Sequence, residues 1–245
     1  NTIVHYNEMK INNLSELLNM EVLLLCGGKG TRLHPLTKTI PKPLVKIKDQ
    51  TIIDYIIKHL HNSGLNKFLI CSGYKSEMIE NHINNYKIIN AKIINSGKVD
   101  ILQRILDCKN MINDKFMVCY GDTIANINIE KLNKFHKSHS GIATICSYQL
   151  KQNFGIIKNN NNKQVISFIE KPEYKDNINI GYFVFDIDVF DHIQFAKNWL
   201  DLIRILIEKK QLFSFEHDGV HITINTLDEL ASAEKSIELY LDTIK

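Results

Sequence analysis

A glycine-rich turn that follows the first strongly apolar run limits the possible folds of this chain more than any other feature. The run VLLLC (residues 22–26) leads directly into GGKGTRL (residues 27–33). A short uncharged run that ends abruptly at glycines is typical of a parallel strand covered on both faces. Glycines in that position let the backbone approach a ligand closely and aim successive N–H groups at phosphate oxygens. The turn therefore predicts an α/β fold with an anion site beside its first strand.

This turn differs from the two common phosphate-binding motifs. Leu33 stands where the dinucleotide motif GxGxxG has its third glycine, and Gly30 follows Lys29 where the Walker A motif needs Ser or Thr. Thr31 and Arg32 add side-chain donors for an anion. On these residues alone, a glycine turn without a ligand stays open as the alternative.

Strand patterns and helix patterns alternate through the first 150 residues and then give way to a strand-rich section. Helices are expected over residues 51–63, 75–86, 101–109, 129–138, 199–210 and 227–244, and strands over residues 67–72, 91–95, 116–120, 143–150, 154–158, 164–169 and 180–185. Alternation at these intervals implies right-handed crossovers and a mostly parallel sheet. We therefore predict a Rossmann-like α/β fold, with a mostly parallel mixed sheet flanked by helices and a small strand-rich section.

Composition and charge limit the partners of such a chain. Its 245 residues fit a single domain over 21–245 after a polar, Asn-rich extension over 1–20. A formal net charge of +3 is too balanced for a nucleic-acid surface or a polybasic membrane patch. No apolar run approaches the roughly 20 residues that cross a bilayer, and the five dispersed cysteines are typical of reduced core thiols. We expect a cytoplasmic protein with neither a nucleic-acid nor a membrane partner.

A proline-flanked lysine follows the glycine turn. In Pro41-Lys42-Pro43, the two prolines restrict the backbone on both sides of the lysine, so its ammonium is held in place. A fixed cation near a triphosphate assists catalysis, whereas the same motif alone is also compatible with a solvated lysine in a surface loop.

Together these motifs give the chain a family resemblance. GGxGTRL and PKP, followed by YGD (120–122), NFG (153–155), SFIEKP (167–172) and FEH (215–217), resemble the nucleotidyltransferases that join a nucleoside triphosphate to a sugar 1-phosphate. The likeness extends from Glu21 to about Leu239 and is greatest to the glucose-1-phosphate cytidylyltransferases. In that family, an oxygen of the acceptor phosphate attacks the α-phosphorus in line and pyrophosphate leaves, so catalysis consists largely of positioning and charge neutralisation.

The resemblance implies roles for individual residues. The catalytic residues would be Arg32, which stabilises the leaving pyrophosphate, Lys42, which contacts the α-phosphate and the acceptor phosphate, and Asp122. The resemblance assigns nucleotide binding to Cys26, Gly27, Gly28, Gly30, Thr31, Arg32, Gly73, Arg104, Tyr120 and Gly121.

The same resemblance implies a metal cofactor and an acceptor pocket. Asp122 would bind Mg²⁺, a cation that prefers carboxylate and phosphate oxygens, and Asn225 stands at the position of a second metal ligand. Lys171 would hold the acceptor phosphate, while Asn179 and Gly181 would line the acceptor pocket.

Three segments depart from the family pattern. The glycine-rich segment that shapes the base pocket is reduced to residues 95–100, Asn225 replaces the usual aspartate, and residues 198–202 (NWLDL) replace an acidic segment that grips sugar hydroxyls. The second and third departures fall on the metal and acceptor side. They point to a changed acceptor, to a sugar held by different groups, or to an inactive relative.

The sequence thus predicts a Mg²⁺-dependent cytidylyltransferase. It would transfer CMP from CTP to a phosphorylated small molecule, for surface polysaccharide or capsule biosynthesis, and would assemble as a homo-oligomer. A non-sugar acceptor such as L-glutamine phosphate or phosphocholine, another base, and a non-catalytic nucleotide-binding relative are the alternatives.

Overall fold

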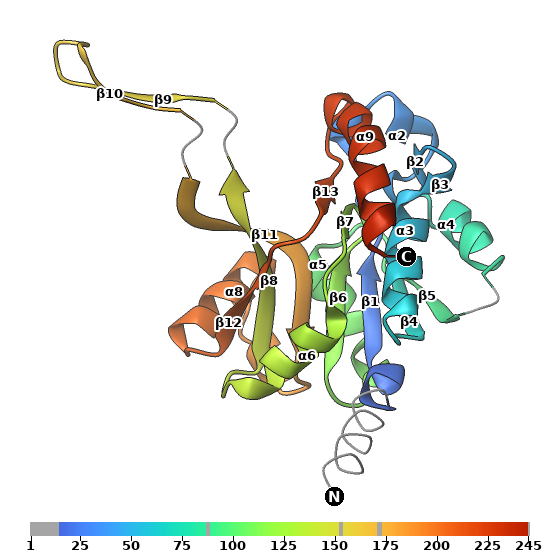
Figure 1. The fold of residues 1–245 in the computed structure, drawn as a ribbon. Coiled ribbons are helices and arrows are strands. Elements are labelled where there is room, and N and C mark those ends of the chain that lie inside the picture. The colour runs from blue at the N-terminus through green and yellow to red at the C-terminus, as the bar shows by residue number, and fades with distance from the viewer. Residues whose placement is uncertain (1–14, 87–88, 152–153, 171–172, 245) are drawn as a thin grey trace, which may run out of the picture.

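A seven-stranded sheet forms the centre of the protein (Figure 1). The computed structural model describes residues 15–86, 89–151, 154–170 and 173–244. The strands lie in the order β12 (Leu212–His217), β8 (Ala143–Lys151), β11 (Glu173–Phe185), β6 (Phe116–Tyr120), β1 (Glu21–Leu25), β4 (Lys67–Ser72) and β5 (Asn90–Asn95). β11 pairs antiparallel with both of its neighbours, and the other pairs are parallel. The mostly parallel mixed sheet predicted from the sequence is confirmed.

Helices cover both faces of this sheet, and each face has its own apolar core. One core contains side chains of α3 (Ile52–Asn62), α4 (Ser76–Ile83), α6 (Ile129–Ser138) and α9 (Leu227–Thr243). The other contains side chains of α5 (Ile101–Asp107), α7 (Val189–Ile193) and α8 (Trp199–Glu208). The strands between them are apolar on both faces, as a doubly covered sheet requires. All five cysteines are buried and free, in agreement with core thiols.

Short strand pairs extend the fold at the carboxyl ends of the central strands. β7 (Thr123–Ala125) pairs with β13 (His221–Thr223) directly after β6, and β2 (Lys46–Ile47) pairs with β3 (Gln50–Thr51). β9 (Ile156–Asn159) and β10 (Val165–Ile169) form a hairpin that projects away from the body in Figure 1. This hairpin and β11 make up the predicted strand-rich section, whereas α7 and the β7–β13 pair had no recognisable signal.

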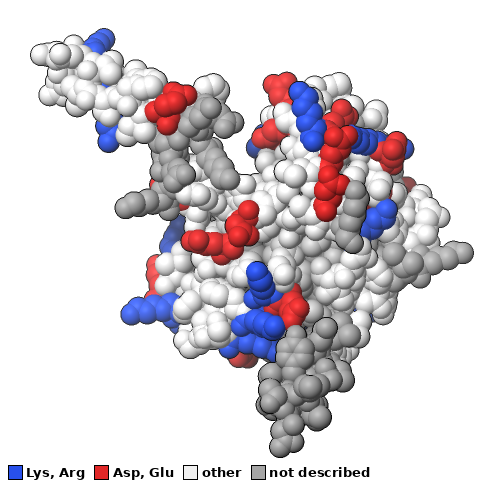
Figure 2. Space-filling model, in the orientation of Figure 1, with Lys and Arg blue, Asp and Glu red and all other residues white. Residues whose placement is uncertain are grey.

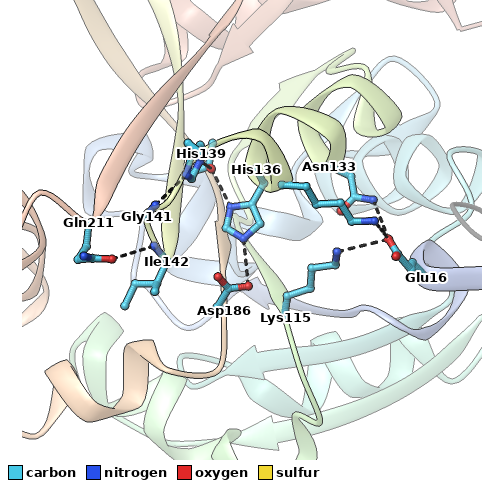
Figure 3. A network of polar contacts seen from close by, with 11 residues as sticks. Glu16, Lys115, Asn133, His136, His139, Gly141, Ile142, Asp186 and Gln211 are labelled. Atoms are coloured by element: carbon cyan, nitrogen blue, oxygen red, sulfur yellow. Dashed lines mark hydrogen bonds and ion pairs between the residues drawn. The ribbon is translucent and has the colours of Figure 1, made fainter.

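Residues 15–20 of the predicted N-terminal extension pack against the body of the domain. Leu17 and Met20 are buried in the first core, and the Glu16 carboxylate pairs with the ammonium groups of Lys115 and Lys137. Figure 3 shows this contact beside a chain of hydrogen bonds that includes His136, His139 and Asp186. The remainder of the extension, 1–14, lies outside the described residues.

The surface agrees with a small net charge. Figure 2 shows cationic and anionic side chains interspersed on one face of the molecule, with the projecting hairpin mostly uncharged. Among the helices of the described residues, none is both long enough and apolar enough to cross a membrane.

Candidate active site

A pocket of about 750 Å³ opens at the carboxyl ends of β1 and β6, which is where parallel sheets bind ligands. Its walls come from the glycine turn, the segment before α5, the start of α8 and the residue before the N-cap of α9. The lining includes Cys26, Gly27, Gly28, Gly30, Thr31, Arg32, Lys42, Arg104, Tyr120, Gly121, Asp122 and Asn225. The structure therefore brings most of the predicted site residues together in one cavity.

The glycine turn is held in shape by contacts behind it. Gly30 has φ +61°, a conformation that favours glycine, and its carbonyl accepts a hydrogen bond from the buried Thr37 hydroxyl at 2.7 Å. A Cβ atom on Gly30 would lie 3.0 Å from the Lys42 side chain. In contrast, a Cβ on Gly28 would meet no atom within 4 Å. The free space at Gly28 is therefore room on the pocket side of the turn, where a ligand can approach the backbone.

Arg104 joins the turn to the neighbouring wall. Its side chain is almost fully buried, and its guanidinium donates to the carbonyl oxygens of Ser72, Gly97 (2.8 Å), Val99 (3.3 Å) and Gly27 (3.4 Å). These carbonyls belong to three separate segments of the chain. The guanidinium is therefore committed to the backbone, and it fixes the reduced segment 95–100 against the glycine turn.

Gly73 lies behind this arginine and outside the lining of the pocket. A Cβ atom there would come within 2.4 Å of the Gly97 carbonyl oxygen and 2.8 Å of the Arg104 guanidinium. Only glycine leaves room for this packing, so Gly73 contributes to the site through Arg104.

Four side chains from four segments converge at the mouth of the pocket. The Lys42 ammonium donates to Asp122 Oδ2 at 2.6 Å and to Asn225 Oδ1 at 3.0 Å, and Arg32 Nη2 donates to the same Asn225 oxygen at 2.9 Å. Lys42 is 8% exposed, at the start of a short 3-10 helix that follows the extended Pro41. The prediction that the prolines hold this lysine in place is thus consistent with its geometry.

The orientation of Asn225 follows from its position before α9. Its amide nitrogen donates to the Thr223 hydroxyl at 3.1 Å, and its backbone N–H donates to Glu229, which also completes the capping box of α9 with Thr226. The amide oxygen consequently faces Lys42 and Arg32. Because this group carries two cations and a single carboxylate, the mouth of the pocket has a surplus positive charge that favours a polyanionic ligand.

The oxygens that could hold a metal are few. Among the described residues, no three His, Cys, Asp or Glu side chains gather into a metal site. Asp122 supplies one carboxylate, whose Oδ1 accepts from the Thr123 hydroxyl at 3.3 Å, and Asn225 supplies one amide oxygen. Asp122 Oδ2 and the Asn225 amide oxygen both accept from the Lys42 ammonium, and both are of the hard type that Mg²⁺ prefers.

The predicted acceptor residues border the pocket through Tyr120. The Asn179 side chain hydrogen-bonds the Tyr120 hydroxyl and accepts from the Gly181 N–H at 2.8 Å. Gly181 has φ +78°, and a Cβ there would lie 2.5 Å from the Tyr120 ring. Lys171, the predicted ligand of the acceptor phosphate, lies outside the described residues.

Sequence reasoning missed several residues that line the cavity: Lys29, Lys98, Asp100, Asn198, Trp199 and Leu200. Trp199 had been noted only as part of a segment that departs from the family pattern. In the structure its indole N–H donates to the Tyr120 hydroxyl at 3.1 Å, and its ring packs edge-on against Phe183. The one signal for this role is that the only tryptophan of the chain follows an Asn that caps a helix.

Comparisons with known proteins agree with this geometry. The family model described as Nucleotidyl transferase matches residues 21–229. A "Probable glucose-1-phosphate cytidylyltransferase" of Bacillus subtilis (strain 168) is 29% identical over 243 residues, covering 88% of this chain and 95% of that protein. A mannose-1-phosphate guanyltransferase of Saccharomyces cerevisiae is 30% identical over 240 residues, covering 92% of this chain and 66% of that protein.

The same fold occurs in solved structures. The crystal structure of HddC from Yersinia pseudotuberculosis has a TM-score of 0.68 and 21% identity to this chain, and the match covers 89% of this chain and 99% of that one. At that level of identity the likeness concerns the fold alone.

Proposed function

The chain belongs to the nucleotidyl transferase family, and from that membership and its pocket we propose that it transfers CMP from CTP to a phosphorylated small molecule. The observation that carries this proposal is the convergence of Arg32, Lys42, Asp122 and Asn225 at the mouth of a cavity bordered by the glycine turn. Two cations and one carboxylate beside a glycine turn are the elements that phosphoryl transfer requires.

The arrangement supports an in-line transfer. The glycine turn would bind the triphosphate through backbone N–H groups, and Arg32 would neutralise the charge that develops on the leaving pyrophosphate. Lys42, fixed by Asp122 and Asn225, would donate to the α-phosphate and to the attacking phosphate as negative charge builds between them. Because the two reacting groups are anions, catalysis at this site would consist mainly of binding them next to each other.

The residues present also fit a Mg²⁺ ion. Asp122 and Asn225 would hold it, with substrate phosphates completing its coordination, because this ion commonly takes one or two protein oxygens and keeps phosphate and water ligands. When bound, the ion supplies a Lewis acid that polarises the phosphoryl oxygens. Since Asn225 adds no negative charge, the affinity for the metal would depend mainly on Asp122.

Asp122→Asn tests this assignment directly. The variant should need about tenfold more Mg²⁺ for half-maximal activity and should turn over more slowly, since the metal then loses its carboxylate ligand. Pyrophosphate release measured across a Mg²⁺ titration would report both effects, with Asp107→Asn as an exposed control. An unchanged titration would argue against Asp122 as a ligand.

The choice of CTP is supported by the name of one relative. The Bacillus subtilis protein, aligned over nearly its full length, is named a cytidylyltransferase, whereas the yeast relative is named for guanylyl transfer. A guanylyl-, uridylyl- or thymidylyltransferase is thus the alternative within the family. Our proposal places the product as an activated precursor for a surface polysaccharide or its modification.

The acceptor is proposed to be a sugar 1-phosphate or an analogue of one. Trp199 and Leu200 line the pocket where relatives of this kind are expected to present an acidic residue, and this observation keeps a non-sugar phosphate in consideration.

One experiment addresses base and acceptor together. Pyrophosphate release with Mg²⁺ should be measured for CTP, GTP, UTP, ATP and dTTP, each crossed with sugar 1-phosphates, phosphocholine and phosphoamino acids. We expect turnover with CTP and a sugar 1-phosphate. Turnover with another nucleotide alone would overturn the choice of base, and no turnover under any condition would favour a nucleotide-binding relative without activity.

A further inference from the structure

The two sides of the pocket differ in charge. The side formed by the glycine turn and its neighbours presents five cations, Lys29, Arg32, Lys42, Lys98 and Arg104, against two carboxylates, Asp100 and Asp122. A second group of lining residues, called here the aromatic side, consists of Tyr120, Asn198, Trp199 and Leu200, all of them uncharged. Phosphate groups are favoured on the first side, so the aromatic side is left for the body of the second substrate.

The Tyr120 hydroxyl is fixed within the aromatic side. The Trp199 indole nitrogen can only donate, so the Tyr120 oxygen is the acceptor in their 3.1 Å hydrogen bond. The Asn179 side chain hydrogen-bonds the same hydroxyl, and the ring lies against Gly181, where a Cβ would clash with it. Two segments of the chain, α8 and β11, thus set both the ring and its oxygen.

The Tyr120 oxygen accepts from Trp199, and the Asn179 contact lowers the pKa of Tyr120, as a hydrogen bond donated to the oxygen does. Within the described part of the chain, no hydrogen bond runs from the Tyr120 O–H to another residue. Burial raises the pKa of Tyr120 above its ordinary value, and the nearby Asp122 carboxylate acts in the same direction, so the phenol remains protonated at neutral pH. An oriented O–H that borders a cavity is a ready donor for a ligand atom.

On the basis of the proposed transferase function, we propose that Tyr120 determines acceptor specificity by donating its hydroxyl proton to an oxygen atom of the acceptor's body, and that Trp199 and Asn179 position it. The favoured acceptors are phosphate esters with an uncharged body that carries hydroxyl or carbonyl oxygens. Phosphocholine ends in a quaternary ammonium group, which offers no hydrogen-bond acceptor there, and gains nothing from this donor. A site built around such a donor discriminates against ligands that leave it unpaired.

The protein contains its own reporter for this contact. Trp199 is the only tryptophan of the chain and is bonded to Tyr120, so intrinsic fluorescence arises at the aromatic side of the pocket. We expect glucose 1-phosphate, added to the wild-type protein with Mg²⁺ and CTP absent, to change this fluorescence saturably. Phosphocholine should bind at least about tenfold more weakly, the factor that one hydrogen bond supplies.

Two variants separate the contact from a general structural role. Tyr120→Phe keeps the ring against Gly181 and should weaken binding of glucose 1-phosphate about tenfold, a larger loss than any it causes in the affinity for CTP. Trp199→Phe keeps the packing but loses the indole N–H, and calorimetry should show a smaller loss of about threefold for glucose 1-phosphate alone. Tyr55→Phe is the matched control, because it removes a buried hydroxyl that donates to Ile47 outside the pocket.

Several results of these binding measurements would overturn the role proposed for Tyr120. Unchanged binding of glucose 1-phosphate to Tyr120→Phe, equal losses for glucose 1-phosphate and CTP, or absence of any acceptor binding to the wild-type protein would each overturn it. Tight binding of phosphocholine that Tyr120→Phe leaves intact would do the same. If the wild-type protein binds glucose 1-phosphate through Tyr120 yet releases no pyrophosphate, the transferase proposal fails and the contact stands.

Discussion

The glycine-turn side and the aromatic side of the pocket are built by different means. On the first, the glycine turn and the proline-flanked lysine lie within the 17 residues from Gly27 to Pro43, and only Lys98 and Arg104 join them from a later segment. On the second, Tyr120, Asn179 and Trp199 come from β6, β11 and α8 and meet only after the chain has folded. The backbone groups proposed to bind phosphate thus come from one local motif, whereas the groups proposed to choose the acceptor meet only through tertiary packing.

The two sides also differ in how a substitution should act. Removing a cation from the glycine-turn side removes an interaction with the negative charge that develops in the transition state, so it should lower kcat strongly. Removing a neutral hydrogen bond from the aromatic side should change the affinity for one substrate. The following predictions test that contrast.

The largest effect is expected at Lys42. Lys42→Ala should lower kcat at least about a hundredfold, because the transition state loses a buried, fixed cation. Steady-state pyrophosphate release with CTP and the acceptor found in the substrate panel would measure it. Lys58→Ala is the control, since that ammonium donates to Gln50 at the surface. Near-normal turnover of Lys42→Ala would show that Lys42 is not catalytic. It would also contradict the expectation that charges on the glycine-turn side have the larger effect on catalysis.

A second effect, on stability and on nucleotide affinity, is expected at Arg104. Arg104→Lys should lower the free energy of unfolding by about 2 kcal/mol, because an ammonium cannot reach all the carbonyls that the guanidinium fork satisfies. Because these contacts also hold segment 95–100 against the glycine turn, their loss should raise the KM for CTP. Urea denaturation and initial rates would measure the two effects.

Arg204→Lys provides the matched control for this change. Its side chain is 68% exposed and pairs with Asp201 at 3.3 Å, so the same substitution should change stability by less than about 0.5 kcal/mol. Equal losses in the two variants would show that Arg104 does not hold the wall of the pocket.

Two glycines offer a comparison of the two sides by the same substitution. Gly28→Ala places its methyl group in open space, so it should leave Tm unchanged and raise the KM for CTP about tenfold by obstructing the triphosphate. Gly181→Ala should lower Tm by several degrees, because φ is +78° and the methyl group meets the Tyr120 ring. Its KM for the acceptor should rise more than its KM for CTP. If Gly28→Ala instead raised the KM for the acceptor and Gly181→Ala the KM for CTP, the glycine turn would bind the acceptor and the aromatic side the nucleotide.

Local patterns explain how much of this site the sequence revealed. The order of strands and helices followed from apolar periodicity, and the residues of the glycine turn, Lys42 and Asp122 were assigned to one site through motifs of three to seven residues. The commitment of Arg104 to carbonyls of Ser72 and Gly97 was not recognisable, since those partners are selected by the packing of α5 on β1 and β4. Trp199 was invisible for the same reason, because no pattern near α8 indicates that β6 lies beside it.

The smallest expected effect is a loss of stability at low pH, which should concern the whole fold and not one side of the pocket. Burial lowers the pKa values of His59 and His139, and burial together with the nearby His217 lowers the pKa of His221 to about 4. None of the lining residues in the described part of the chain is a histidine. The histidines that take up protons in this range therefore act on the fold from outside the pocket.

The sign follows from proton binding. Between pH 6.5, the ordinary value for histidine, and about 4, the unfolded chain binds more protons at these positions than the folded protein, so stability rises with pH across that window. We expect the free energy of unfolding to fall by about 1 kcal/mol or more from pH 7 to pH 4.5. His221→Asn should flatten the lower part of this profile, because the variant cannot take up that proton when it unfolds. A profile that is level from pH 7 to pH 4.5, or one that Lys58→Ala alters as much as His221→Asn, would show that the buried histidines do not set the acid response.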